Sequence, residues 1–265
     1  SQVLEPGERR TGPLEMCALT RPNVHCQELL AVVAARRISP KDAGPETASP
    51  AEGTSPRQIL LDKDSCLVLT SQVQEGCLDW TAPTDGEYEL FAFWLHGTGQ
   101  TASPAVRTSY TINYIDRYGV EAFIDYWNRE VITEEMKESI ARNSRVQMYM
   151  DSLELSTYGR GGQFWGYHLL EEFRQRRGYD LTPWLPFVLK AAGSMEVEYF
   201  YYYTCSDKVF LDKLHHDLYQ TMTDLYMENM LKPMQEWLHS IGMTLRAEIS
   251  YGLPFEISQP GKYVD

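Results

Sequence analysis

The clearest pattern of apolar and polar positions lies between residues 146 and 186. Residues 146–150 form an apolar run that ends at Asp151, which predicts a buried strand. Residues 164–177 have the spacing of an amphipathic helix, and Gly178 with a proline-containing turn predicts its end. Strands that carry carboxylates at their C-terminal ends and continue into helices build the active sites of (β/α) barrels. The pattern therefore indicates part of an enzyme.

Strands and helices alternate through the second half of the chain, which favours parallel βαβ units. The further elements predicted there are a strand at 110–116, helices at 119–132 and 134–142, a long helix at about 206–240, and a strand at 243–249. Pro233 is expected to kink or restart the long helix. A closed barrel needs about eight strands, and only about three fit here. The expectation is therefore an open parallel sheet or part of a larger barrel.

The first part of the chain has a different pattern. Short alternating runs begin at residue 58 and recur about every 8–12 residues, which predicts a β-rich module over 58–105. Residues 1–57 are rich in Pro, Gly, Ser and charge, and we expect a loop-rich segment with one strand near 28–35. Residues 106–265 would then be the first part of a barrel domain that is truncated at its C-terminus. The start at Ser1, without Met or a signal-peptide pattern, suggests an excised piece.

Charge narrows the classes of partner. The chain has 24 Lys and Arg against 37 Asp and Glu, a net charge of −13. This acidity disfavours nucleic acid, whose phosphates need a basic surface, and disfavours an anionic membrane surface. No apolar run reaches the roughly 18 residues of a membrane-spanning helix. A neutral glycan is compatible with this composition.

The cysteines leave two alternatives open. Cys17 with Cys26 and Cys66 with Cys77 are close enough in sequence to form disulfides, which would suit a secreted protein, but buried free thiols are equally compatible. At least one of the five, which include Cys205, stays unpaired within the chain. No cysteine or histidine spacing indicates zinc. We expect a secreted or periplasmic location.

Several long motifs resemble one enzyme family. DSLEL (151–155), FRQRRGYDLTPWLP (173–186) and LRAEISYGLPFE (245–256), together with residues 61–94, resemble the α-L-rhamnosidase-like glycoside hydrolases of family 106. The resemblance spans roughly 58–265. It implies an α/β fold, part of a (β/α)8 TIM-type barrel preceded by a smaller β-rich module. It also implies hydrolysis of terminal α-L-rhamnosidic bonds of an oligosaccharide or polysaccharide with inversion, two catalytic glutamates, and calcium near the sugar.

Glycoside hydrolysis usually needs two carboxyl groups, one protonated and one ionised. The resemblance implies that Glu154 is the general acid, because desolvation just past a buried strand favours the protonated form. Glu248 is the other candidate catalytic residue, as a sugar-hydroxyl acceptor or a base. Relatives often carry Gln at that position, and a salt bridge to Arg246 is the structural alternative. The second glutamate of the family is expected downstream, with Glu256 and Asp265 as the candidates left in this chain.

The remaining candidates concern substrate binding. We expect Asp151 to contact the sugar, although it could instead cap the following turn or pair with an arginine. Trp165, Tyr158 and Tyr251 could stack on a pyranose ring, and core packing is the alternative for each. Asp116 is expected to cap the following helix rather than bind calcium. The other functions left open are a non-catalytic glycan-binding module and a glycosidase of different sugar specificity.

Overall fold

The computed structural model describes residues 1–19, 21, 23–38, 57–101, 108–143, 145–151, 163–189, 201–249 and 256–265. Its strands are β1 (Gln2–Leu4), β2 (Arg9–Pro13), β3 (Gln27–Arg36), β4 (Arg57–Leu60), β5 (Leu67–Val68), β6 (Cys77–Thr81), β7 (Tyr88–His96), β8 (Gln147–Met150), β9 (Tyr201–Thr204) and β10 (Thr244–Ala247). Its α-helices are α1 (Arg117–Tyr126), α2 (Glu134–Arg142), α3 (Leu169–Arg177), α4 (Leu185–Val188), α5 (Lys208–Tyr226) and α6 (Lys232–Ser240). The protein is thus a mixed α/β chain.

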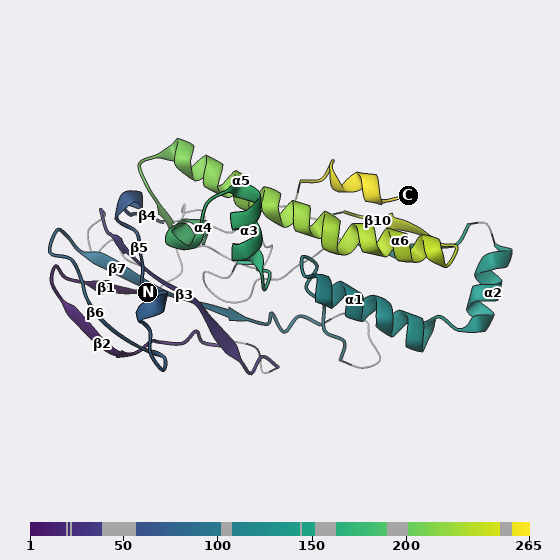
Figure 1. Ribbon diagram of the computed structural model, residues 1–265, viewed down its shortest axis with the longest axis horizontal. Coiled ribbons are helices and arrows are strands. Elements are labelled where there is room, and N and C mark those ends of the chain that lie inside the picture. The colour runs from purple at the N-terminus through teal and green to yellow at the C-terminus, as the bar shows by residue number, and fades with distance from the viewer. Residues whose placement is uncertain are drawn as a thin grey trace.

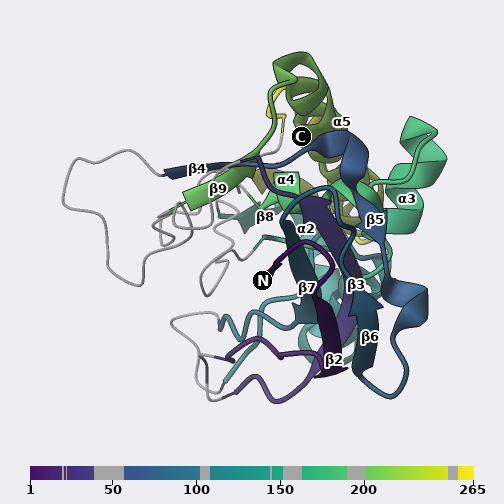
Figure 2. The ribbon, with the colours of Figure 1, turned by 90° about the vertical axis from the view of Figure 1, so that its left-hand side faces the viewer.

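An antiparallel sheet of order β1-β7-β3-β5 lies at one end of the molecule (Figure 1). β3 is central in this sheet and apolar at successive positions, so both of its faces are buried. Ala31 and Ala35 contact the core shared with the helices, whereas Val32 and Ala34 contact a second, smaller core. The second core is closed by the two-stranded sheet β2-β6 (Figure 2). The β-rich region is therefore a small sandwich.

Residues 1–57 contain more strands than the sequence predicts. We expected residues 1–57 to be loop-rich apart from one strand. In the structure β1 and β2 also form, because they pair with the distant strands β7 and β6. Neither short strand has a strong alternating pattern of its own, so its partner supplies the hydrogen bonds that hold it. The expected strand at 28–35 forms as β3, and the loop predicted at 39–56 lies outside the described residues.

Within the β-rich module, the apolar run at 66–73 forms only the two-residue strand β5, and a 3-10 turn at Thr70–Gln72 follows it. The hydroxyl of Thr70 accepts a hydrogen bond from the backbone N–H of Val32 at 2.9 Å. A side chain thus takes the place of a backbone partner next to the central strand, and the strand pairing ends there.

Two parallel strand pairs characterise the α/β part. β10 pairs with β8. β4 pairs with β9, and these two strands lie side by side in Figure 2. The strand expected at 110–116 is wrong: Tyr110 forms only an isolated bridge with Thr101, and a turn follows. The reason is local, because the side-chain oxygen of Asn113 accepts the N–H of Ile115 at 3.2 Å and bends the backbone.

The predicted helices form, with adjusted limits. Asp116 caps α1 as expected, its carboxylate accepting the N–H of Tyr118 at 3.0 Å. α2 has the predicted limits, whereas α3 begins at Leu169, later than expected. α5 and α6 run on through a π-helical turn as one long rod (Figure 1), and Pro233 stands in the first turn of α6. The proline therefore restarts the helix, where its missing N–H costs nothing.

A buried polar cluster joins the sandwich to the α/β part. The guanidinium of Arg37, just after β3, lies 2.5 Å from a carboxylate oxygen of Glu89 in β7, and both side chains are almost fully buried. The hydroxyl of Tyr203 in β9 donates to the other oxygen of Glu89 at 2.5 Å. Glu89 therefore links elements that are far apart in the sequence.

Gly178 ends α3 in the left-handed conformation, with φ of 79°. Space around its Cα is open, so only the backbone conformation opposes a side chain. Replacement by Ala is expected to lower the free energy of unfolding by about 1 kcal/mol. Urea denaturation measures this, with Gly97→Ala as the matched control, because Gly97 has open space and no positive φ. Equal effects of the two substitutions would contradict the prediction.

Candidate active site

The parallel strands β8 and β10 present one apolar face and one polar face. Met148 of β8 and Ala247 of β10 pack against the large core. On the other face Gln147 pairs with Thr244, and their side chains hydrogen-bond at 3.1 Å. One step along, Tyr149 stands opposite Arg246, whose guanidinium carbon lies 5.4 Å from the centre of the tyrosine ring. Polar side chains of the two strands thus meet in successive layers.

Asp151 and Glu248 follow on this polar face, each two residues beyond the layer of Tyr149 and Arg246. The backbone N–H of Glu248 donates to the carbonyl of Met150 at 3.0 Å, so the strand pairing continues to this point. Parallel strands place their carboxyl ends at the same edge of a sheet. The two acids are therefore neighbours in space. In the sequence they are far apart, as are the paired residues Gln147 and Thr244 of the same two strands, which 97 positions separate.

The hydroxyl of Tyr149 joins the two carboxylates. It lies 2.8 Å from Oε1 of Glu248 and 3.3 Å from Oδ1 of Asp151. Because both oxygens contact one hydroxyl, they lie within two hydrogen-bond lengths of each other. The hydrogen bond to Glu248, followed by desolvation and the charges of both acids, raises the pKa of Tyr149 to about 12. Tyr149 is therefore protonated at neutral pH and donates.

The other predicted site residues have mixed outcomes. Glu154, Tyr158 and Tyr251 lie outside the described residues. Trp165 is partly buried against the large core, and its carbonyl accepts the side-chain amide of Asn113 at 3.0 Å. Its indole nitrogen is buried and has no hydrogen-bond partner among the residues that the structure describes. The role of Trp165 at a sugar therefore stays a prediction.

Glu256 and Asp265, the alternative acids near the C-terminus, have structural partners. Glu256 accepts hydrogen bonds from the hydroxyl of Ser258 and the backbone N–H of Gln259, and these lower the pKa of Glu256. Asp265 accepts the N–H of Leu245 at 2.8 Å and contacts His239 at 2.9 Å. Both acids therefore fix the C-terminal turn.

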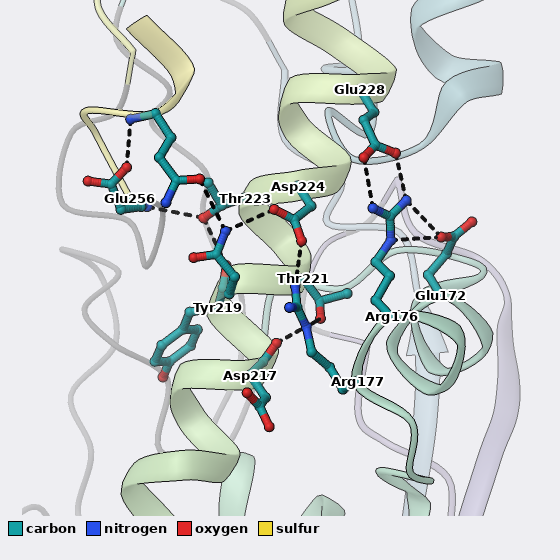
Figure 3. A network of polar contacts seen from close by, with 12 residues as sticks. Glu172, Arg176, Arg177, Asp217, Tyr219, Thr221, Thr223, Asp224, Glu228 and Glu256 are labelled. Carbon is teal, nitrogen blue, oxygen red and sulfur yellow. Dashed lines mark hydrogen bonds and ion pairs between the residues drawn. The ribbon is translucent and has the colours of Figure 1, made fainter.

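Arg176 and Arg177 anchor the C-terminal end of α3 through ion pairs. Arg176 lies between Glu172 of its own helix and Glu228 in the π-helical turn, with N–O distances of 3.0 and 2.6 Å (Figure 3). Arg177 contacts Asp224 of α5, and its Nε donates to Thr221 at 2.9 Å. These contacts fasten α3 to the long α5–α6 rod.

The five cysteines are free thiols. Burial is the main cause that raises the pKa of Cys66 to about 12, so this thiol is not a nucleophile at neutral pH. Within the described residues, no group of three or more His, Cys, Asp or Glu side chains is placed to hold a metal ion. No helix found there is long and apolar enough to cross a membrane.

Carboxylates at the ends of parallel strands in an α/β chain define the kind of site that glycoside hydrolases use. The family model for glycoside hydrolase family 106, described as alpha-L-rhamnosidase, matches residues 43–253. The chain therefore belongs to the α-L-rhamnosidase family 106 of glycoside hydrolases.

One solved structure supports the fold. The chain is similar to the rhamnosidase from Novosphingobium sp. PP1Y with a TM-score of 0.54 and 20% sequence identity. The likeness covers 77% of this chain and 19% of that protein, so the chain spans about a fifth of the length of that rhamnosidase. At this identity the similarity concerns the fold alone. A search of curated proteins gave no match.

The residue that the sequence analysis missed is Tyr149. Within the sequence it is one member of an apolar strand, VQMYM, and nothing local separates it from Met148 or Met150. Strand alternation does place Tyr149 on the same face as Asp151, which is the only sequence signal for it. Its second partner, Glu248, comes from a strand that pairs only in the folded chain.

Proposed function

We propose that this chain forms part of a glycoside hydrolase that cleaves terminal α-L-rhamnosidic bonds of oligosaccharides or polysaccharides with inversion. The observation that carries the proposal is the pair Asp151 and Glu248 at the carboxyl ends of neighbouring parallel strands. Membership of the α-L-rhamnosidase family supports the sugar. The acidic surface is compatible with a neutral glycan.

We further propose that β8 and β10 belong to a (β/α)8 barrel, with the sandwich preceding it. The two faces of this strand pair support the barrel. Met148 and Ala247 contact the helical core, as outward-facing barrel residues do, while the layers of Gln147 with Thr244 and of Tyr149 with Arg246 point the other way. In a barrel that second face is the interior, and its carboxyl end is the site of catalysis.

In the proposed reaction Glu154 donates its proton to the glycosidic oxygen while the bond from that oxygen to the anomeric carbon breaks. A water molecule attacks the anomeric carbon from the opposite face and gives its proton to a carboxylate base, so the products are L-rhamnose and an alcohol. No described residue is assigned as that base. Asp151 accepts a hydrogen bond from a sugar hydroxyl and orients the ring, whereas the hydrogen bond that Glu248 accepts from the sugar strengthens as charge develops on the ring.

The binding of calcium remains a prediction of the family resemblance. The cellular location of the protein also remains a prediction. Calcium takes about six to eight oxygen ligands, and among the described residues no three or more His, Cys, Asp or Glu side chains are grouped to hold a metal ion. No step of the proposed reaction depends on calcium. A secreted or periplasmic location is proposed because a polymeric glycan is met outside the cytoplasm.

Release of L-rhamnose from an aryl α-L-rhamnoside by the whole protein tests the proposed function. Aryl glycosides of other sugars, assayed in parallel, test the specificity. We expect sugar to be released faster from the aryl α-L-rhamnoside than from any of the other aryl glycosides. Release from an aryl glycoside of another sugar alone would show that the protein is specific for that sugar and not for rhamnose. Binding of L-rhamnose in calorimetry, without release from any of the glycosides, would identify a glycan-binding module instead of an enzyme.

Asp151→Asn tests the substrate-binding role of this acid. Loss of one charged acceptor for a sugar hydroxyl is expected to raise KM about 10-fold, because hydrogen bonds to charged groups contribute about 1.5–3 kcal/mol. The chemical step keeps its acid and its base, so kcat should change less than KM. Initial-rate kinetics with the aryl α-L-rhamnoside measures both. An unchanged KM would remove Asp151 from the substrate site.

A further inference from the structure

Tyr149 occupies an unusual position between two acids. Its side chain is 51% exposed, so burial does not explain its orientation. The hydroxyl reaches Glu248 on the neighbouring strand at 2.8 Å and Asp151 on its own strand at 3.3 Å. The guanidinium of Arg246 lies 5.4 Å from the ring centre and covers the ring from the neighbouring strand. Both the ring and the hydroxyl are thus held.

We propose that Tyr149 is a positioning residue that couples Asp151 and Glu248 into one unit of the active site. The inference deepens the proposed function and rests on it. Tyr149 acts through the two carboxylates and is not assigned a contact with the reacting atoms.

The physical reason is the repulsion between two neighbouring acids. Like charges at this separation disfavour each other, and without a donor between them each side chain would turn away toward water. A hydroxyl carries one hydrogen, and the shorter distance, 2.8 Å to Glu248 against 3.3 Å to Asp151, makes Glu248 the favoured acceptor. The hydroxyl reduces the repulsion and fixes both rotamers before the sugar arrives. Orientation fixed in advance lowers the reorganisation that the transition state requires.

The strand pair β8–β10 itself contributes three charged groups to this unit. From β10 the facing charges are Arg246 and Glu248, and from the end of β8 the facing charge is Asp151. Gln147 and Thr244 face the same side one layer below and are neutral. The hydroxyl of Tyr149 is thus placed to set the relative orientation of the two carboxylates.

Tyr149→Phe removes the hydroxyl and keeps the ring under Arg246. In the whole protein we expect kcat for the aryl α-L-rhamnoside to fall about 10-fold or more with KM changed by less than about threefold, since the loss concerns transition-state interactions. Tyr179→Phe is the matched control. The Tyr179 hydroxyl also donates to a carboxylate, Asp217, at 2.8 Å, but it lies past the C-terminal end of α3. The control variant Tyr179→Phe is therefore expected to leave kcat for the aryl α-L-rhamnoside unchanged.

A double-mutant cycle separates positioning from a merely structural role. If Tyr149 acts through Glu248, Tyr149→Phe should lower kcat/KM by no more than about twofold in a Glu248→Gln background, because residues in one network are not additive. If Tyr149→Phe lowered kcat/KM by the same factor in the wild type and in the Glu248→Gln variant, the proposal would be overturned. Thermal unfolding of each variant identifies any loss that comes from stability.

A second measurement does not depend on activity. With ¹³Cζ-labelled tyrosine, the signal of Tyr149, assigned through its absence in Tyr149→Phe, should show a neutral phenol up to pH of about 10.5. In Glu248→Gln it should ionise at lower pH, since an ordinary tyrosine has a pKa of about 10. If the wild type releases no rhamnose, the proposed function fails, and this titration alone decides whether the three residues are coupled. Identical titrations in both proteins would overturn the coupling.

Discussion

Glu248→Gln in the whole protein is expected to lower kcat/KM for an aryl α-L-rhamnoside by about 10- to 10²-fold, because a hydrogen bond to a charged group contributes about 1.5–3 kcal/mol. The carboxylate stands at the end of β10, where it is held by Tyr149, and in the proposed reaction it accepts a hydrogen bond from the sugar that strengthens in the transition state. Gln keeps the size of the side chain and removes its charge. Glu154→Gln is expected to reduce the rate by a factor of about 10² or more, because removal of a general acid costs that amount.

Glu256→Gln is the matched control for both substitutions. Glu256 is also an acid near the C-terminal end of the chain, but it accepts hydrogen bonds from Ser258 and Gln259 in its own turn. Its replacement should leave kcat/KM within about threefold of the wild type. Full activity of Glu248→Gln would remove Glu248 from the site, and full activity of Glu154→Gln would remove Glu154 as the acid while leaving the family membership intact.

Glu89→Ala lowers the free energy of unfolding by about 3–5 kcal/mol, because it removes the buried carboxylate that lies 2.5 Å from the buried guanidinium of Arg37. It also removes the acceptor of the Tyr203 hydroxyl. For a chain of this size the loss corresponds to a decrease in Tm of roughly 10 °C. Thermal unfolding followed by circular dichroism measures it.

Two further variants show that charge, rather than volume, causes this effect. Glu89→Gln keeps the shape and is expected to cost less than Glu89→Ala, since an amide oxygen still accepts from Arg37 and Tyr203. The double variant Arg37→Met with Glu89→Leu removes both charges and should recover most of the stability. A double variant less stable than Glu89→Ala would show that packing, not the loss of the Arg37–Glu89 ion pair, dominates at this junction.

Local signals in the sequence predicted most helices and their ends. Asp116 and Gly178 mark helix limits through groups within a few residues, a capping carboxylate and a left-handed backbone. The helix 134–142 and the restart at Pro233 follow from the same short-range chemistry. These helix limits depend on hydrogen bonds between residues that lie within one or two helical turns of each other. They can therefore be predicted from the neighbouring sequence, without knowledge of the surrounding fold.

Strands were harder to predict because their partners are remote. β1 and β2 form against β7 and β6, and the expected strand at 110–116 is replaced by a turn at Asn113. The ends of β8 and β10 could be predicted individually from their apolar runs. Their adjacency could not, since the parallel pairing has the helices α3, α5 and α6 between its two strands.

The sequence by itself determined the family, through its long ordered motifs, and placed Asp151 and Glu248 at the ends of two strands. It did so because strand ends and helix caps are set by neighbouring residues. Only the tertiary structure decided that these acids share one hydroxyl, that Tyr149 supplies it, and that Arg37 and Glu89 are buried together. The contacts of Tyr149 with Glu248 and of Arg37 with Glu89 join separate strands, and their formation depends on the pairing and packing of the whole chain.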